Sequence, residues 1–506
     1  MPVLFVLLAT TPPIQMVRNF VRCFEKAGTN RPTGTAQFTR RRAVLLHILL
    51  TTGIAVPSFA QSENISPELP GTNSAADTFY ALFDINASNL VLNFGDRLAN
   101  ASFANVTFKT IAQNLYPGTW FWETGDRFLV NQFGHPYQGS AYFSSARVNG
   151  FNFYRSIPFA FIGSLQWEIV YEPNSSINDV ITTTIGGISL GEMLHRLFLE
   201  VDESPSAGAK IGSFFISPVG RFNAIFNRPK LEKGVGAMYR LSFNAGFEKS
   251  FAHFAGHQTE ALSWQSPGMY AGANVIYGDP FTQEILKPYD QFEASADFAT
   301  NIASYNMRII SDGYLFSLTP SRTPKTDTST GLTMHYDFFN ATNNIIDNVG
   351  HGNIQFSSNA IDWTVKHAYS LSEQTHFSVK AHAGLVLWGT SMYNDTVMSE
   401  TYLRDTRSTY GIGENLKLFF TVTREKTGTL ELAATGYHIS NIPVTASHST
   451  GNVFFLNCSA TYDFPLNEHI GIGATLRYWN LWGQYDAAEN IHRTLASAGA
   501  HTSFRF

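Results

Sequence analysis

The sequence predicts an all-β transmembrane antiparallel barrel of about 12 to 14 strands, preceded by an N-terminal α-helical region that forms a plug or a cap. Three observations lead to this fold class. The chain is poor in charge and rich in aromatic residues, its C-terminal half alternates apolar and polar residues, and its connections alternate between tight turns and long loops.

The composition excludes several classes of protein. Only 14% of the 506 residues are charged, against about 25% in a typical soluble protein, while aromatic residues make up another 14%. After residue 60 no apolar run reaches the roughly 18 residues that a membrane helix needs, which excludes helical transporters and channels. The net charge of −5 becomes more negative once the basic N-terminus is removed, so nucleic acid is not an expected partner.

Residues 1–60 are predicted to be a signal or targeting segment. Arginines occupy positions 40–42, an apolar stretch covers 43–56, and a Ser-Phe-Ala cleavage site ends at Ala60. Export would leave 61–79 as a flexible leader. It would also leave Cys458 as the single cysteine, so neither a disulfide nor a cysteine metal cluster is expected.

Residues 80–232 are predicted to be mixed and rich in helix. The clearest helix starts with Ser176 and Asp179, a capping pair, and continues with apolar residues at spacings of three, four and seven. Gly187 and Gly191 form a small-x-x-x-small pair that would let another backbone approach closely. Further helices are expected at about 101–115, 140–169 (interrupted near Gly150 and Pro158) and 211–226. Two arrangements remain open, a plug inside the barrel and a periplasmic cap.

Residues 233–506 are predicted to form the barrel, because the hydrophobic period changes to two. In the segment 454–464, for example, apolar side chains at even positions alternate with polar ones at positions 457, 459, 461 and 463. About 10 residues per strand plus connections give roughly 12 strands, and the segments Asn89–Phe94 and Phe128–Phe133 could add two more.

The connections and the last strand point to the bacterial outer membrane. Tight turns near 372–373, 424–426 and 465–467 alternate with long loops, which is typical of outer-membrane barrels. The final strand ends at Phe506, and a terminal Phe on an alternating strand resembles the signal read by the barrel-assembly machinery. The expected partners are therefore outer-membrane lipid and that machinery, for a monomer in a Gram-negative bacterium.

One block of residues stands apart from the barrel. It reads Gly134-His135-Pro136-Tyr137-Gln138-Gly139 and is followed by a Trp167-Glu168 pair and by Ser176-Ile177-Asn178-Asp179. Over roughly residues 115 to 230 this resembles an uncharacterised family of bacterial outer-membrane proteins with a G-H-P-Y-x-G block, a W-E pair and an S-I-N-D helix start. The resemblance implies an outer-membrane barrel and no known activity.

The side chains of this block could serve a binding or catalytic site, but their spacing matches no metal or nucleophile motif. The structural interpretation is that the His-Pro-Tyr sequence shapes a turn, the aspartate caps a helix, and Arg147 or Arg155 pairs with Glu168 or Glu192. No catalytic residue is assigned. The candidates in this block are His135, Tyr137, Arg147, Trp167, Glu168, Asn178, Asp179 and Glu192.

A second set of candidates lies on the polar face of the strands, which would face a hydrated lumen. Their mixed charges suit either simple solvation or a solute path. Two of the histidines lie six residues apart on one strand, too far to share a metal, so no metal and no cofactor is predicted. The lumen candidates are His335, Asp337, Asp362, Lys366, His376, Lys380, His382, Lys417, Glu431, Asp463 and Arg477.

The predicted function is that of a plugged, porin-like transporter for small or lipidic molecules. A lipid-handling or structural outer-membrane protein is the first alternative, and a lipid-modifying enzyme of the outer membrane is the second. For the enzyme, Ser378 and His376 share a face of one strand, which is weak support for a catalytic dyad, and His367 faces outward without an evident partner.

Overall fold

A computed structural model describes residues 73–123, 127–226, 237–255, 261–264, 267–280, 284–301, 304–323, 325–343, 354–394, 406–443, 450–486 and 490–506. The predicted signal segment lies outside these residues. The chain divides into two compact units, one built from residues 92–121 and 166–175 and one built from 73–91, 122–165 and 176–506.

The smaller unit contains the end of α4 (Ala75–Leu98), the short helices η1 (Ser102–Ala104), α5 (Phe108–Asn114) and η2 (Pro117–Thr119), and η4 (Trp167–Tyr171). Asn114 holds it together, because its amide donates hydrogen bonds to the carbonyl oxygens of Glu168 at 3.1 Å and Glu172 at 2.8 Å. The Asn114 carbonyl in turn accepts a hydrogen bond from the Trp120 indole at 2.8 Å. A buried asparagine thus satisfies backbone groups at the end of η4.

The helices of the larger unit are the start of α4, η3 (Val130–Gly134), α6 (His135–Val148), α7 (Phe153–Gln166, of which the last residue lies in the other unit), α8 (Ile177–Glu203), α9 (Ala207–Ile216) and α10 (Pro218–Ile225). The predicted start of α8 is confirmed, since the Ser176 hydroxyl accepts a hydrogen bond from the Asp179 backbone amide. The predicted break near Gly150 is also confirmed: this residue has a φ of 85° between α6 and α7. The break predicted near Pro158 does not occur, because Pro158 lies inside the continuous helix α7.

The helices α6 and α8 cross at glycines. A β-carbon on Gly187 would lie 2.5 Å from the carbonyl carbon of Gly139, and one on Gly139 would lie 1.9 Å from the carbonyl oxygen of Thr183. Gly191 faces the ring of Phe143 in the same way, at 2.7 Å. The close approach predicted for Gly187 and Gly191 therefore occurs, and Gly139 supplies the other side of it.

Among the described residues, 13 strands form one antiparallel sheet. They are β1 (Met238–Ala255), β2 (Ala261–Trp264), β3 (Gly268–Tyr277), β4 (Phe292–Thr300), β5 (Ser304–Arg322), β6 (Thr326–Asn343), β7 (Ile354–Ser372), β8 (Thr375–Asn394), β9 (Thr406–Arg424), β10 (Gly428–Asn441), β11 (Gly451–Pro465), β12 (Ile470–Tyr485) and β13 (Ile491–Arg505).

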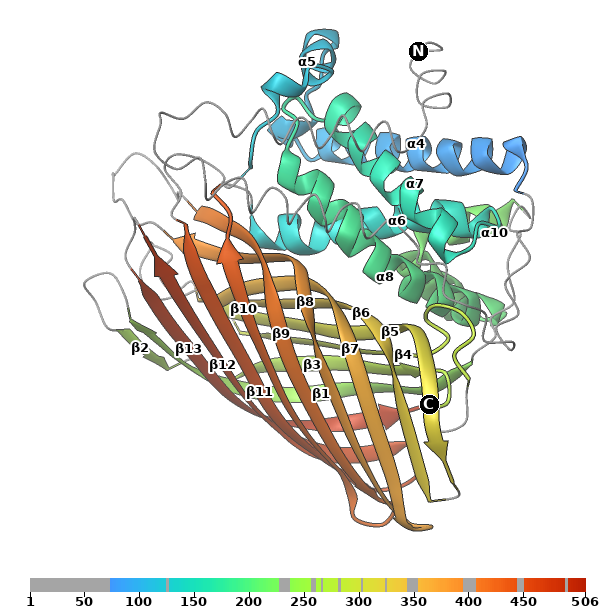
Figure 1. Cartoon of the computed structure of the whole chain (residues 1–506), viewed down its shortest axis with the longest axis vertical. Coiled ribbons are helices and arrows are strands. Elements are labelled where there is room, and N and C mark those ends of the chain that lie inside the picture. Colours follow the sequence, from blue (N-terminus) through green and yellow to red (C-terminus); the bar gives the residue numbers. More distant parts are fainter. Residues whose placement is uncertain are drawn as a thin grey trace. The chain divides into compact units, whose positions relative to one another are not determined.

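The sheet closes on itself because β13 pairs with β1, from Ser242 opposite Arg505 to Ala255 opposite His492. The backbone amide of Phe506 extends this seam by donating to the Leu241 carbonyl at 2.9 Å. Both β2 and β3 pair along the same edge of β1, so the described strands make a closed barrel of 12 staves (Figure 1). The barrel prediction is confirmed at the lower end of its range.

Two predicted strands are wrong. Asn89–Phe94 lies within α4, and Phe128–Phe133 lies in a helical segment that leads into α6. Both are short apolar runs, and a short apolar run does not by itself distinguish a strand from a buried helix. The helix α4 also begins at Ala75, inside the range expected to be flexible leader.

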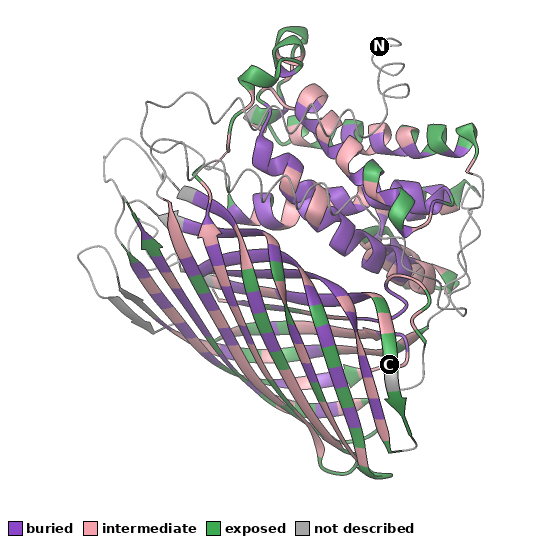
Figure 2. Cartoon of the chain, in the orientation of Figure 1, coloured by how far each residue is buried: buried purple, intermediate pink, exposed green. Residues whose placement is uncertain are grey.

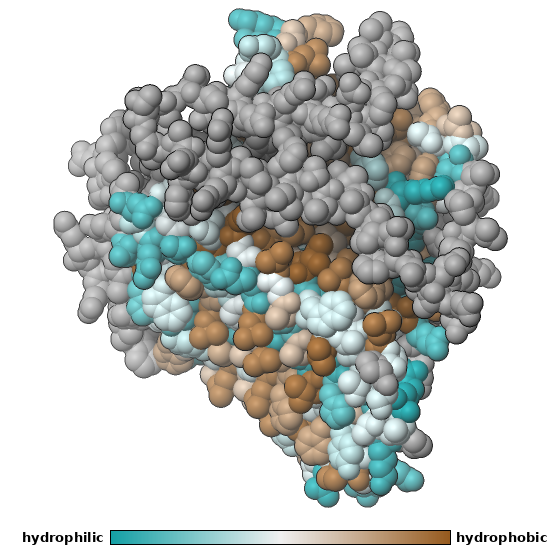
Figure 3. All heavy atoms as spheres, in the orientation of Figure 1, coloured by the Kyte–Doolittle hydropathy of each residue, from teal (hydrophilic) through white to brown (hydrophobic). Residues whose placement is uncertain are grey.

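The two faces of the wall differ as the alternation predicts (Figure 2). In β9 the Lys417 side chain is buried, while its neighbours Leu416 and Leu418 are 54% and 47% exposed. Trp363 and Leu385 are exposed on the same outer face of β7 and β8. Figure 3 shows hydrophobic side chains gathered on the visible outer wall. Apolar side chains therefore point away from the lumen, as in a barrel with lipid around it.

Part of this outer face is covered by helices of the same unit. In β6, Tyr336 and Phe338 alternate with the inward-facing His335 and Asp337, and so they point outward. The Tyr336 hydroxyl donates to the Gln132 carbonyl at 2.5 Å, and the Phe338 ring lies 5.5 Å from that of Phe128. Figure 1 shows α6 and α8 along this side of the barrel.

Further contacts place α8 on the same outer face. The Trp388 indole donates to the Thr182 hydroxyl at 2.9 Å, and the Tyr410 hydroxyl accepts a hydrogen bond from the Asn178 amide at 3.0 Å. The sequence did not decide between a plug inside the barrel and a cap. In the structure, the described contacts of α8 with the wall lie outside the lumen. Within the described segments, no helix combines the length and hydropathy that crossing a bilayer requires.

Candidate functional site

The lumen contains the polar residues that the alternation predicted. Strand register places all the lumen candidates on the inward face of the wall. Residues directly opposite each other on neighbouring strands share a face, and each candidate lies opposite residues that point inward. Most are buried, but the Glu431 side chain is 49% exposed and lies 3.8 Å from Arg240, which is 40% exposed. The lumen is therefore open to water near the tight-turn end and dry further in.

A first group of charges occupies the middle of the lumen, and we call it the central cluster. It consists of Glu293, Asp312, His335, Asp337, Asp362, Lys380, His382 and Lys417.

The lysines of the central cluster tie distant strands together. Lys417 on β9 lies 2.5 Å from the Asp337 carboxylate on β6 and 3.9 Å from that of Asp362 on β7. Lys380 on β8 lies 2.9 Å from Asp312 on β5 and 2.8 Å from Glu293 on β4. Since these strands are not neighbours, the ion pairs cross the lumen and restrict it.

A second charged group, the Arg477 cluster, lies in the same lumen and shares strands β4 and β5 with the central cluster. It consists of Glu248, Tyr270, Asp297, Arg308 and Arg477. The Arg477 guanidinium on β12 lies 3.1 Å from Asp297 on β4 and also pairs with Glu248 on β1. The Tyr270 hydroxyl donates to Asp297 at 2.6 Å, and Arg308 lies 2.5 Å from the same carboxylate. Each charge in this dry region is thus matched.

Other lumen candidates have local partners. His501 lies 3.0 Å from Asp463, and the Lys366 ammonium donates to the Pro280 carbonyl at 3.0 Å. The His376 ring is paired with the Ser370 hydroxyl at 2.9 Å rather than with Ser378.

The outward-facing His367 also has a partner, since the Thr328 hydroxyl lies 2.9 Å from its Nδ1. With His376 bonded to Ser370, these contacts do not assemble the dyad considered for an enzyme.

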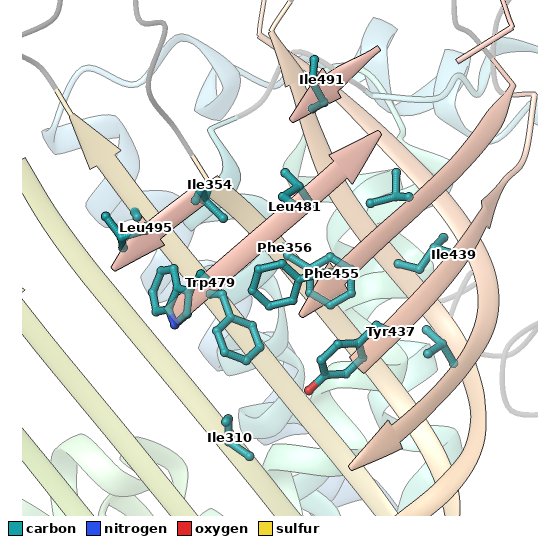
Figure 4. Close-up of a cluster of buried hydrophobic side chains, with 14 of the residues drawn as sticks. Ile310, Ile354, Phe356, Tyr437, Ile439, Phe455, Trp479, Leu481, Ile491 and Leu495 are labelled. Carbon is teal, nitrogen blue, oxygen red and sulfur yellow. The ribbon is translucent and has the colours of Figure 1, made fainter. Parts of the chain in front are cut away.

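Beyond the charges, toward the long loops, the lumen is closed by an aromatic layer. We define it by Phe339, Phe356, Tyr437, Phe455 and Trp479, all fully or nearly fully buried. The Phe339 ring on β6 lies 4.7 Å from that of Phe455 on β11 and 5.5 Å from that of Trp479 on β12. Figure 4 shows Phe356, Tyr437, Phe455 and Trp479 reaching toward one another from separate strands, with Ile354 and Leu481 nearby.

The aromatic layer was not predicted. Two of its members, Phe339 and Phe455, lie on the odd face of β6 and β11, which the alternation assigned to a hydrated lumen. The sequence carried one indication of this layer. Near the start of β11 the inward positions 453 and 455 are apolar, Val453 and Phe455.

The motif block serves mainly to pack helices. His135 is buried at the start of α6, with its Nδ1 3.0 Å from the Thr183 hydroxyl on α8. Tyr137 donates from its hydroxyl to the Phe215 carbonyl at 2.6 Å. The block thus joins α6 to α8 and α9, where a turn was expected.

The predicted ion pair of the helices is Arg147 with Glu192, at 2.7 Å. Glu192 also lies 2.9 Å from Arg196, and Arg196 lies 2.9 Å from Asp290 in the β3–β4 connection. The neighbouring His195 is fully buried, and burial together with the two arginines lowers its pKa well below the usual value. The chain of pairs links α6, α8 and the barrel.

At the start of α8 the Asn178 amide donates to the Asp179 carboxylate at 2.7 Å. Burial is the main cause that raises the pKa of Asp179 to about 7, while hydrogen bonds from Ser176 and Asn178 lower it. In the other unit, Trp167 stacks on Tyr171 at 5.9 Å and Glu168 is buried. The block is therefore shared between the two units.

Solved structures that are similar to this chain include outer-membrane proteins. They are the Pseudomonas putida toluene transporter TodX (11% identity, covering 53% of this chain and 89% of that one, TM-score 0.22), the NanC porin (12%, 51% and 98%, 0.22) and the Acinetobacter baumannii outer membrane protein Omp33 (10%, 53% and 99%, 0.20). No curated protein matches the chain.

The helical region has a family match. Residues 119–219 match the model described as a domain of unknown function, DUF3943. These residues include α6, α7, α8 and α9, and the glycine crossing and the Glu192 pairs join α6 to α8. This region thus resembles a family of unknown function, as the sequence indicated.

Proposed function

We propose that the chain is an outer-membrane barrel that passes small molecules through a gated lumen. The observation that carries this proposal is the layered lumen: a charged region open to water at one end and an aromatic layer that closes the other. A barrel that served only as a scaffold would not need a water-accessible, charged interior.

Several features favour the outer membrane. The wall is closed, so it leaves no row of unpaired backbone groups, and most strands expose apolar side chains outward. The predicted signal segment suits export. From β5 onward, tight turns on one side and longer connections on the other agree with insertion in one direction.

The aromatic layer is suited to act as the gate. Its rings contact one another across the lumen through dispersion and apolar burial, with few directional bonds to break. Moving one or two rings would join the charged region to the long-loop side. The charged residues below it favour small polar solutes.

The helices are positioned to hold this gate. Phe338 packs on Phe128 outside the wall, and the next residue, Phe339, belongs to the gate inside. Similarly, Ser357 donates to the Gln132 side chain at 2.7 Å, while the adjacent Phe356 is a gate residue. A movement of the helices would therefore reach the gate through two strands.

Flux measurements on Phe455→Ala test the proposal. In liposomes containing the refolded protein, wild type should pass small sugars and ions slowly, and Phe455→Ala should raise the flux at least several-fold because it opens a gap in the layer. Phe454→Ala is the matched control, since Phe454 is the neighbouring residue but points outward and is exposed.

Equal flux through the two variants would refute the gate. No flux through any of the three proteins would instead favour the lipid-handling alternative, in which the lumen does not conduct.

A further inference from the structure

Three side chains in the central cluster form a constellation that no single stretch of sequence contains. His335 lies on β6, Asp362 on β7 and His382 on β8, and all three are buried. One donor atom from each lies within 4.8 Å of the other two. His335 Nε2 is 3.2 Å from the nearer Asp362 oxygen, close to the spacing of about 3.3 Å expected between two ligands of one tetrahedral metal ion.

The second observation is an unsatisfied ring nitrogen. His382 Nε2 has no hydrogen-bond partner among the described residues, although the ring is fully buried. Its other nitrogen, Nδ1, is held by the Thr364 hydroxyl at 2.7 Å. A histidine fixed at one nitrogen with the other nitrogen free is the usual state of a metal ligand before the ion binds.

The charge balance around the site favours a cation. The ion pairs of the central cluster set four carboxylates against two lysines, with the histidines taken as neutral. Adding Lys366, whose backbone partner is Lys380, still leaves one negative charge in excess. The Glu293 side chain is 36% exposed, so water stabilises part of this excess, and a cation bound among the buried carboxylates would compensate the negative charge further.

We propose that His335, Asp362 and His382 bind a divalent first-row transition metal, such as Zn²⁺. Two imidazoles and one carboxylate are a ligand set for such ions, and Asp312, whose oxygen lies 3.9 Å from His382 Nε2, is positioned to provide a fourth ligand. The ion would join β5 to β8 at the level just below the aromatic layer. This inference does not depend on whether the barrel conducts solutes.

Binding requires a small rearrangement. The Thr333 hydroxyl lies 2.8 Å from His335 Nε2, and the Lys417 ammonium donates a hydrogen bond to His335 Nδ1 at 2.9 Å. With the ion on Nε2, the ring proton of the neutral imidazole would move to Nδ1, and Lys417 would leave that nitrogen and keep its stronger partner Asp337. His382 would move by about 1 to 1.5 Å to bring its nitrogen within bonding distance.

Zinc content measures the proposal directly. The full exported chain, refolded without an affinity tag and stripped with EDTA, is incubated with Zn²⁺, desalted and analysed by elemental mass spectrometry. Wild type should retain one ion per chain and unfold at a higher temperature with Zn²⁺ than with EDTA. His382→Ala and Asp362→Asn should each weaken zinc binding by about tenfold or more.

The matched control is His501→Ala, which removes another buried lumen histidine, one that already has a partner in Asp463. It should bind zinc as wild type does. Heat-modifiable gel migration identifies the folded barrel in every sample, and His382→Gln replaces the alanine variant if that one does not fold. The proposal is overturned if folded wild type retains no stoichiometric zinc, or if the His382 variants bind as tightly as His501→Ala.

Discussion

Adding one methyl group at the crossing of α6 and α8 should destabilise the helical region, although alanine is the better helix former. A β-carbon on Gly187 would lie 2.5 Å from the Gly139 carbonyl carbon and 2.6 Å from its Cα. Both neighbours are backbone atoms, so the helices must separate. Ordinary contact begins near about 3.4 Å, and overpacking of this size typically costs about 1–3 kcal/mol.

The higher helix propensity of alanine offsets about 1 kcal/mol of this cost, so Gly187→Ala should lower the free energy of unfolding by up to about 2 kcal/mol net. Gly139→Ala should lose at least as much, because its β-carbon would lie 1.9 Å from the Thr183 carbonyl oxygen. Urea unfolding of the refolded protein in detergent can be followed by the fluorescence of Trp122, which stacks on Trp388 at 6.2 Å.

Gly208→Ala is the control, because nothing lies within 4 Å of the β-carbon it would add on α9. It should leave the urea midpoint unchanged or raise it slightly. If Gly187→Ala and Gly139→Ala behave like Gly208→Ala, the helices do not cross at these residues and the packing argument is wrong.

Two further perturbations address buried charge. The pKa of Asp179 is raised in the folded state, so the unfolded chain loses the Asp179 proton first, and stability falls as pH rises from about 4 to 7. Asp179→Asn should remove this pH slope in urea titrations. Glu203→Gln, at the exposed end of α8, should keep it. Lys417→Met should destabilise the barrel by about 3–5 kcal/mol, because it leaves Asp337 buried without its cation. Combining it with Asp337→Leu should recover most of the lost stability, as measured by thermal unfolding. Equal pH slopes for Asp179→Asn and wild type, or a double variant no better than Lys417→Met, would contradict these two expectations.

The closed lumen gives a physical account of why so many charges are tolerated inside a barrel. Arg477 and Lys417 each reach carboxylates on strands that are not their neighbours, which is possible only when opposite walls are close. The same closeness brings Phe339 against Trp479. Ion pairs and aromatic contacts therefore depend on one narrow lumen, and widening it at one level would weaken both.

The larger part of the architecture could be predicted from sequence. Alternation identified the outward Leu416 and Leu418 and the inward Lys417, because a strand has only two faces. The capping pair located the start of α8 within a residue, and the glycines indicated a close helix contact. These features are local, since each depends on residues within a few positions of one another.

Other features depended on strands far apart in the chain. The period of two shows that His335, Asp362 and His382 point inward, but the register of β6, β7 and β8 decides that they meet. In the same way, whether Phe339 faces water or Trp479 depends on how near the opposite wall lies.

Sequence alone therefore determined the barrel class, the face of each strand residue and the capped helix. Tertiary structure decided that α8 lies against the outer wall, that rings close the lumen, and that two histidines and an aspartate share one place. The physical reason is that periodicity is set by the backbone geometry of a single segment, whereas contacts across a lumen are set by the registers of all the strands together.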